Sequence, residues 1–457
     1  MRLTVIGCGH LGATHAACMA AIGHDVLGVE IDEDRADLLN SGRAWFLEPG
    51  LDALLTRHTQ NGRLRFTTSF AEAAAFATVH FLAVGTPSLP GGDGYDLSQV
   101  AGAIAALAPH LTTPAVVIGK STVPPGTTGY LARELRESAP AGDAVEVAWN
   151  PEFLREGHAV ADTLRPDRIV VGVPSMAAEA TVRELYRPLT EAGVPLMVTD
   201  EVTSELVKGA ANAFLAMKVS FINAMSDVCR GTGANVAVLA DALGMDQRIG
   251  RPFLTAGLGY GGGCLPKDVR GLAAFATSTG AKGAADLLSV VDGINSARRE
   301  QVVDLVRGLL GELSDKRIAL WGAAFKPGTD DVRDSPGLDV ADRLARLGAE
   351  VVVYDPQATG NALVTFPHLR YGDSAVAAAW QADAVLVTTA WPEFAAMDTA
   401  ATTSAVRDRL LIDACQATKP SLWRAAGWTV AAPFPTPDYP ERSPVTSDTA
   451  SGSRQAG

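Results

Sequence analysis

The sequence of 457 residues is poor in cysteine. No two of its five cysteines have the C-x2-C spacing of a zinc site, and an odd, sparse set is a poor disulfide framework. We therefore expect a protein of a reducing compartment, without structural disulfides and without a metal site. The five positions are Cys8, Cys18, Cys229, Cys264 and Cys415.

Positive charge and long apolar runs are also scarce. Lysine and arginine number 38 against 51 acidic residues, and the net charge of −13 argues against a general nucleic-acid binder. No stretch of about 20 residues is free of charges and helix breakers, as a membrane span would be. The apolar run after Met1 is too short for a signal peptide. The sequence predicts a cytoplasmic protein that binds neither nucleic acid nor membrane.

Apolar residues make up 47% of the chain and charged residues 19%, which is enough for several cores. Short apolar strands alternate with amphipathic helices in the first and last thirds, and the β pattern stops between them. The sequence predicts an α/β protein with two Rossmann-like, doubly wound parallel-sheet domains. A long central helix and an all-α middle section join them. The predicted boundaries are 1–200, 201–312 and 313–436, followed by a disordered tail over 437–457.

The predicted strands are short and almost wholly apolar. In the first domain they are Leu3–Ile6, Asp25–Val29, Val79–Val84, Ala115–Gly119, Val145–Trp149, Ile169–Val173 and Leu196–Thr199. In the last domain they are Arg317–Trp321, Glu350–Tyr354, Ala384–Thr388 and Leu410–Asp413. The central helix is predicted over Glu201–Arg230, which has few breakers.

A dinucleotide site is predicted at the first strand-to-helix turn. Gly7–Gly12 has the pattern G-x-G-x-x-G, directly follows a strand, and is trailed by a second strand that ends in Glu30. The glycines permit the tight turn and the close approach of a pyrophosphate to the helix N-terminus. A carboxylate at Glu30 suits the ribose hydroxyls and repels a 2′-phosphate, so NAD is favoured over NADP, although Arg35 lies nearby. The alternative is a glycine turn that binds nothing.

The corresponding turn of the last domain lacks this fingerprint. Gly322–Pro327 contains one glycine and a lysine. We expect no second dinucleotide there. A ligand that carries phosphate is one reading, with Lys326 and Arg333 as cations, and exposed loop charges are the other.

The segment Gly259–Asp268 is the most unusual in the chain. Cys264 follows a run of glycines and precedes a helix opened by Pro266, where the helix dipole and Lys267 would favour a thiolate. The other four cysteines are read as small buried hydrophobes. On the central helix Lys208 and Asn212 are four residues apart and share a face, so they either point into a pocket or are a solvated lysine and its neighbour.

Five segments, in this order, resemble the UDP-glucose/GDP-mannose dehydrogenase family over about residues 1–430. The resemblance implies a four-electron oxidation, in which two NAD+ convert the C6 alcohol of a nucleotide sugar to a carboxylate. The cysteine would form a thiohemiacetal and then a thioester, which water hydrolyses. The segments are Asn150–Gly157, Arg165–Val170, Ala211–Leu215, Gly259–Asp268 and Ala324–Pro336.

The same resemblance implies the roles of individual residues. Cys264 would be the nucleophile, Lys208 and Asn212 would hold the oxyanion, Asp268 and Thr122 would act on water and protons, and Glu156 would be a base in hydrolysis. Contacts to NAD are expected from Gly7, Gly9, Leu11, Gly12, Glu30, Arg35, Thr86, Thr122, Glu156, Lys267 and Arg333. Contacts to the substrate are expected from Glu152, Phe153, Leu154, Arg155, Glu156, Lys208, Asn212, Arg248, Phe253, Leu254, Thr255, Ala256, Gly257, Gly261 and Lys326.

The resemblance also implies a homodimer built on the central helix, with Arg248 able to come from the neighbouring subunit. Three positions depart from the pattern: Gly263 stands where Ser is common, Ala224 where Glu is common, and Glu30 where Asp is commoner, a longer acid with the same role. UDP-glucose is the favoured substrate by resemblance. GDP-mannose or a UDP-N-acetylhexosamine is the alternative, and a non-catalytic NAD-responsive binding protein is an alternative of another class.

Overall fold

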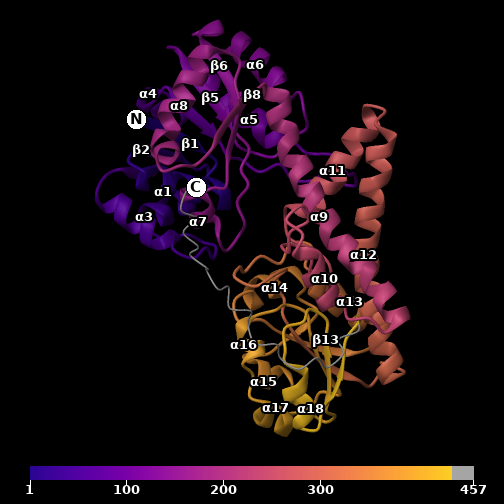
Figure 1. Ribbon diagram of the computed structural model, residues 1–457. Coiled ribbons are helices and arrows are strands. Elements are labelled where there is room, and N and C mark those ends of the chain that lie inside the picture. The colour runs from indigo at the N-terminus through magenta and orange to yellow at the C-terminus, as the bar shows by residue number, and fades with distance from the viewer. Residues whose placement is uncertain (435–457) are drawn as a thin grey trace, which may run out of the picture.

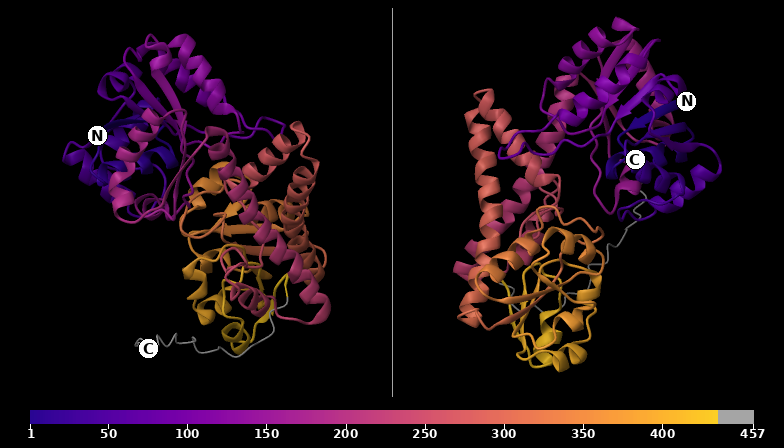
Figure 2. Two further views of the ribbon diagram at one scale, coloured as in Figure 1. Left: turned by 45° about the horizontal axis from the view of Figure 1, so that its top comes forward. Right: turned by 180° about the vertical axis from the view of Figure 1, so that it is seen from behind.

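The computed structural model describes residues 1–434, so the predicted tail over 437–457 lies outside the described residues. Two sheet domains lie at opposite ends of the molecule, and long helices run along one side from the first to the second (Figures 1 and 2). No helix of the described part has the length and apolar character needed to cross a membrane.

The first domain is an eight-stranded sheet in the order β3-β2-β1-β4-β5-β6-β7-β8. Its pairs are parallel except for β6 and β7. All seven predicted strands are present. β3 at the edge was missed, because Leu64–Thr67 alternates apolar and polar residues instead of forming an apolar run. The strands are β1 (Arg2–Ile6), β2 (Asp25–Val29), β3 (Leu64–Thr67), β4 (Val79–Leu82), β5 (Ala115–Gly119), β6 (Val145–Trp149), β7 (Ile169–Gly172) and β8 (Leu196–Thr199).

Helices cover both faces of this sheet, as the near-continuous apolar strands require. Two apolar clusters, one on each face, form the core of the domain, and Trp149 is among its largest fully buried side chains. The helices are α1 (His10–Ala21), α2 (Glu33–Asn40), α3 (Leu51–Gln60), α4 (Phe70–Phe76), α5 (Ser98–Leu107), α6 (Thr127–Ser138), α7 (Ala159–Leu164) and α8 (Met176–Glu191).

The middle section contains helices and loops but no strand between residues 201 and 310, all of which are described. Its longest helix begins where the Asp200 carboxylate accepts a hydrogen bond from the backbone N–H of Thr203, and ends at Gly233 in a left-handed conformation with φ of 75°. α9 packs against α11 and α12. The helices are α9 (Glu201–Thr232), α10 (Val236–Gly244), α11 (Leu265–Ser278) and α12 (Lys282–Leu310).

The last domain is a six-stranded parallel sheet in the order β11-β10-β9-β12-β13-β14. The α/β class with two parallel-sheet domains and a long central helix is thus confirmed. The strands are β9 (Arg317–Trp321), β10 (Glu350–Tyr354), β11 (Arg370–Tyr371), β12 (Ala384–Val387), β13 (Leu410–Asp413) and β14 (Thr429–Ala431). The helices are α13 (Pro336–Arg346), α14 (Thr359–Thr365), α15 (Ala375–Ala378), α16 (Pro392–Ala395), α17 (Thr399–Ala405) and α18 (Pro420–Ala425).

Candidate active site

The turn between β1 and α1 has the shape of a phosphate cradle. Gly7 adopts φ of 84°, and a Cβ on Gly12 would lie 1.8 Å from the Gly7 carbonyl oxygen, so α1 is docked as closely as glycine allows. A Cβ on Gly9, at the helix N-terminus, would meet nothing within 4 Å. The space beside Gly9 fits a pyrophosphate, which the first N–H groups of α1 can bind.

Glu30 stands at the end of β2, where an acid contacts a ribose in this type of fold. The side chain is fixed, because its two carboxylate oxygens accept from the backbone N–H of Cys8 at 3.2 Å and of Asp32 at 3.1 Å. The residues present therefore fit NAD.

In the last domain the corresponding acid, Asp355, has a different role. One carboxylate oxygen of Asp355 accepts three hydrogen bonds, from the backbone N–H groups of Ala323 and Ala324 and from Nε1 of Trp391, at 2.8–2.9 Å. The Asp355 carboxylate thus stabilises its own turn through hydrogen bonds. It is not available to bind a ribose as Glu30 is.

Other positions expected to contact NAD lie on loops at the same edge of the first sheet. The hydroxyl of Thr86 donates to the carbonyl oxygen of Thr122 at 2.7 Å, which ties together the loops that follow β4 and β5. The Arg35 guanidinium lies over the Trp45 ring at 4.9 Å. The carboxyl ends of neighbouring parallel strands form the crevice in which such folds bind ligands.

A buried ion pair joins α9 to the loop after β6. Nζ of Lys208 lies 2.8 Å from Oε1 of Glu152, and both side chains are almost wholly buried. Burial alone would lower the pKa of Lys208, but Glu152, Cys264 and Asp268 together more than offset this, and the pKa is raised. Lys208 is therefore a fixed ammonium group, and the solvated alternative is excluded.

A second buried cluster lies beside this pair. The Asp268 carboxylate accepts from Nδ2 of Asn212 at 2.6 Å and from Nζ of Lys267 at 2.6 Å. Because Asn212 is one helical turn after Lys208 on α9, these bonds hold the start of α11 against the central helix. Lys267 is paired with Asp268 and gives Cys264 no separate positive charge.

Cys264 is the N-cap residue of α11, and the residue keeps an exposed surface although many protein groups lie around its sulfur. The expectation of a favoured thiolate is wrong for this structure. Burial of the sulfur among protein groups raises the pKa of the Cys264 thiol to about 12. The Glu152 carboxylate adds to this rise, and Lys208 opposes it. Asp268 and Glu156 add to the rise. Burial and three carboxylates thus outweigh the ammonium group of Lys208.

The last domain reaches this site through one loop. Nη2 of Arg333 lies 3.1 Å from Oε1 of Glu156, and Nζ of Lys326 donates to the Glu156 carbonyl oxygen at 2.6 Å. Burial raises the pKa of Glu156, helped by Asp331, and its buried Oε2 has no partner. Burial also lowers the pKa of Lys326. Lys326 and Arg333, the two predicted cations of this loop, therefore both bind Glu156.

Gly263, one of the predicted departures from the family pattern, packs against this loop. A Cβ on Gly263 would lie 2.4 Å from Cζ of Arg333, so the guanidinium fills the space of the missing side chain. Gly261 is approached just as closely, because its Cβ would lie 2.4 Å from the Asp334 carbonyl oxygen. Backbone of the last domain therefore accounts for the glycine at 261. For Ala224, another departure, the structure gives no explanation.

The predicted substrate segment from Phe253 to Gly257 connects the middle section to the last sheet. The backbone N–H of Gly257 donates to Oδ1 of Asn223 at 2.9 Å, and Nε2 of Gln416 donates to the Ala256 carbonyl oxygen at 2.8 Å. Phe253 has φ of 67°, a strained conformation for this residue type. Arg248 lies apart from these contacts, exposed and paired with Asp246 at 2.6 Å.

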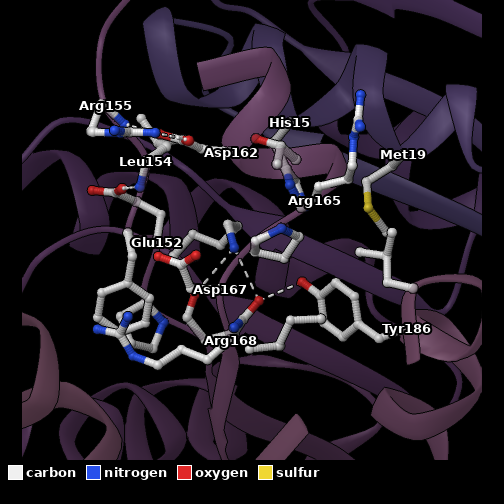
Figure 3. Close-up of a pocket in the computed structure, with 18 residues that line it drawn as sticks. His15, Met19, Glu152, Leu154, Arg155, Asp162, Arg165, Asp167, Arg168 and Tyr186 are labelled. Carbon is white, nitrogen blue, oxygen red and sulfur yellow. Dashed lines mark hydrogen bonds and ion pairs between the residues drawn. The ribbon is translucent and has the colours of Figure 1, made fainter. Parts of the chain in front are cut away.

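A cavity of about 200 Å³ is lined in part by the loop that carries Glu152 (Figure 3). Nζ of Lys120 donates to the carbonyl oxygen and to Oδ1 of Asn150 at 3.3 and 3.0 Å. Burial lowers the pKa of Lys120 to about 8. Lys120 thus anchors the start of the loop through Asn150. The guanidinium of Arg168 also lies 4.0 Å over the ring of Phe153.

Sequence reasoning missed two side chains that the structure ties to the site. His10 lies inside the glycine motif and Glu48 in a loop after α2, and their side chains are hydrogen-bonded to each other at 2.9 Å. Neither position carried a signal in the sequence, because a histidine in a variable motif position and an acid before Pro49 both read as ordinary solvated residues.

The three parts of the chain each match a domain of one family. Residues 1–190 match the NAD binding domain, residues 202–297 the central domain and residues 319–420 the UDP binding domain of the UDP-glucose/GDP-mannose dehydrogenase family. The chain belongs to the UDP-glucose/GDP-mannose dehydrogenase family. It is therefore an NAD-dependent dehydrogenase.

Relatives in this family are similar along nearly their whole length. The UDP-glucose 6-dehydrogenase of Rhizobium meliloti is 42% identical over 416 residues, which are 90% of this chain and 94% of that protein. The UDP-glucose 6-dehydrogenase AglM of Haloferax volcanii is also 42% identical, over 90% of this chain and 96% of that protein. A solved UDP-glucose dehydrogenase of Pyrobaculum islandicum is 36% identical with a TM-score of 0.86, covering 92% of this chain and 96% of that one.

Proposed function

We propose that this dehydrogenase oxidises the C6 alcohol of UDP-glucose to a carboxylate, with two NAD+ consumed per sugar, and releases UDP-glucuronate. The observation that carries the proposal is the cluster of Cys264, Lys208 and Glu152, a nucleophile beside a fixed ammonium–carboxylate pair. Lys326 and Arg333, on the loop of the UDP binding domain, also interact electrostatically with Cys264, which supports a shared site. The substrates in the relatives' names agree with it.

The first stage makes an aldehyde and captures it. Bound in the crevice, NAD+ supplies the oxidising power, accepting one hydride in each of two successive oxidations. The Cys264 sulfur adds to the aldehyde carbon, and the thiol proton moves to the former carbonyl oxygen, so a thiohemiacetal forms. The Lys208 ammonium group stabilises negative charge on that oxygen during the addition, and Glu152 keeps Lys208 protonated and in place. Covalent capture prevents the aldehyde from escaping.

The second stage produces the acid. Loss of a hydride and of the hydroxyl proton turns the thiohemiacetal into a thioester. Water then adds to the carbonyl carbon, the C–S bond breaks, and the sulfur regains a proton. Glu156 can accept the proton from water, because one of its oxygens has no partner and its pKa is raised by burial. Asn212 and Asp268 hold the geometry of the α9–α11 junction during these steps.

The decisive test is the yield of NADH for each UDP-glucose consumed. We expect two NADH and one UDP-glucuronate, whereas a yield of one would indicate an ordinary alcohol dehydrogenase and contradict the proposal. A parallel assay with GDP-mannose and UDP-N-acetylhexosamines decides the substrate. If GDP-mannose or a UDP-N-acetylhexosamine supported NADH formation and UDP-glucose did not, the choice of UDP-glucose would be wrong.

Replacement of the nucleophile separates the enzyme from a non-catalytic binding protein. Cys264→Ser removes the sulfur but keeps a small polar side chain, so formation of the acid should fall by at least about a thousandfold. Mass spectrometry of the product is the measurement, and NADH binding by fluorescence is the control for folding. Full acid formation in this variant would contradict the thioester route.

The same proposal includes a homodimer formed through α9. Four apolar residues of this helix, spaced by seven or eight positions, lie on one face and are between 42% and 58% exposed. A contiguous apolar face of this kind is typical of an interface between subunits. The exposed position of Arg248 is compatible with a role across that interface. The four residues are Leu206, Phe214, Phe221 and Val228.

A further inference from the structure

Four consecutive residues after α2 contact four different parts of the two predicted binding sites. The first two face the dinucleotide site. The ring of Trp45 lies under the guanidinium of Arg35 at 4.9 Å, and the ring of Phe46 stacks on His10 with centroids 4.4 Å apart. Both partners belong to the predicted NAD crevice, because His10 begins α1 and Arg35 lies just after Glu30.

The next two residues face the substrate side. The backbone N–H of Leu47 donates to Oδ1 of Asp330 in the last domain at 3.3 Å. The carboxylate of Glu48 accepts from the backbone N–H groups of Gly157 and Ala159, each at 2.8 Å. Gly157 directly follows Glu156 at the end of the substrate loop.

Glu48 also connects back to the dinucleotide turn. Its Oε2 lies 2.9 Å from Nε2 of His10, and because a carboxylate only accepts, Nε2 carries the proton. The Glu48 side chain is fully buried. Three donors thus hold one carboxylate, two from the substrate loop and one from the first residue of α1, and movement of either part is transmitted to the other.

We infer that Glu48 is a positioning residue that couples occupancy of the dinucleotide turn to the geometry of the substrate loop. The inference rests on the proposed function, since it assigns the substrate to that loop. A ligand bound at the N-terminus of α1 fixes His10, and the His10–Glu48 bond then fixes Gly157 and the carboxylate of Glu156 beside it. By linkage, a ligand on the substrate loop tightens dinucleotide binding by the same factor.

Equilibrium binding tests this coupling without turnover. NADH and UDP-glucose form a complex that cannot react, so the Kd of NADH is measured by fluorescence with and without saturating UDP-glucose. We expect the ratio of the two Kd values to be at least about fivefold in the unaltered protein, a common size for such couplings, and close to one in Glu48→Gln. Glu134→Gln, at an exposed position of α6, is the matched control and should keep the unaltered ratio.

A second variant separates coupling from folding of the loop. His10→Ala removes the link to α1 but leaves the two bonds from Gly157 and Ala159. Hydrogen exchange of these two amides should therefore stay slow in His10→Ala. In Glu48→Gln only one side-chain oxygen remains as acceptor, so exchange of at least one of the two amides should become faster, while the ratio of Kd values falls in both variants. A ratio that is unchanged in both variants, or equal to one in the unaltered protein, would overturn the inference. Failure of the unaltered protein to oxidise UDP-glucose would instead contradict the proposed function.

Discussion

At the scale of single residues, the reactivity of Cys264 depends on charges that are distant in the sequence. Burial raises the pKa of the thiol most, Glu152 and Glu156 raise it further, and Lys208 lowers it. Together the raising effects are larger, so the thiol is protonated at neutral pH. A ligand that brings positive charge close to the sulfur would lower the pKa of the thiol.

The pH dependence of alkylation tests this balance. Only the thiolate reacts with iodoacetamide, and its fraction rises about tenfold per pH unit below the pKa. With a pKa near 12 the rate at Cys264 should still be rising at pH 10. Mass spectrometry of the labelled peptide gives the rate. A plateau near pH 9 would show an ordinary thiol and contradict the balance described above.

Lys208→Met extends the same experiment. The substitution removes the group that lowers the thiol pKa, so labelling of Cys264 at a given pH should become slower than in the unaltered protein. It also leaves Glu152 buried without its partner, which costs about 3–5 kcal/mol of stability. Thermal unfolding therefore has to be recorded beside the labelling rate. Faster labelling in a folded variant would contradict the assigned effect of Lys208.

At the scale of elements, the docking of α1 on its sheet distinguishes two glycines of the same motif. A Cβ on Gly12 would overlap the carbonyl oxygen of Gly7, whereas a Cβ on Gly9 would point into open space. The fold thus requires the glycine at position 12, whereas the glycine at position 9 is one that the predicted pyrophosphate contact would require.

Alanine substitutions should separate these requirements. Gly12→Ala forces backbone to move and should destabilise the protein by about 3 kcal/mol or more. Gly9→Ala should cost less than about 1 kcal/mol, because only the helix cap is affected. It should nevertheless weaken NADH binding by at least about tenfold, because the methyl group occupies the pyrophosphate space. Thermal unfolding and NADH titration are the measurements, and normal NADH binding by Gly9→Ala would contradict the cradle.

The elements show what the sequence could predict. Strands with continuous apolar runs were found, because that signal is local. The spacing of Lys208 and Asn212 also placed both on one face of α9, but it could not show that their partners are Glu152 and Asp268. The thiolate at Cys264 was predicted from its own helix and was wrong, because the carboxylate that opposes it comes from another domain. Glu48 was missed because its partners, His10 and Gly157, lie 38 and 109 residues away.

At the scale of the whole molecule, the exposed face of α9 is the feature that the single chain leaves unexplained. Phe214 and Phe221 lie on this face and are more than 45% exposed. Aromatic side chains at the centre of an interface commonly contribute more than 2 kcal/mol each to association.

A charge on this face should therefore separate the subunits. If the chain forms the proposed dimer through α9, we expect Phe221→Glu to convert it to a monomer at micromolar concentration, since loss of about 2 kcal/mol or more weakens association at least about 30-fold. Sedimentation velocity gives the result. Leu363→Glu, at an exposed apolar position of α14, is the control. A dimer that persists in Phe221→Glu and in Phe214→Glu would place the interface elsewhere.

The loop that carries Lys326 and Arg333 has a consequence for building hybrids from related proteins. It meets the first domain at three points, namely the Leu47 backbone, the Glu156 side chain and carbonyl oxygen, and Gly157, whose Cβ would lie 2.5 Å from the Gly328 carbonyl oxygen. A graft of the last domain from a relative would have to match all three. The last domain therefore cannot be exchanged as an independent module. Recombination within this family should succeed only when the loop and its three contact points are transferred together.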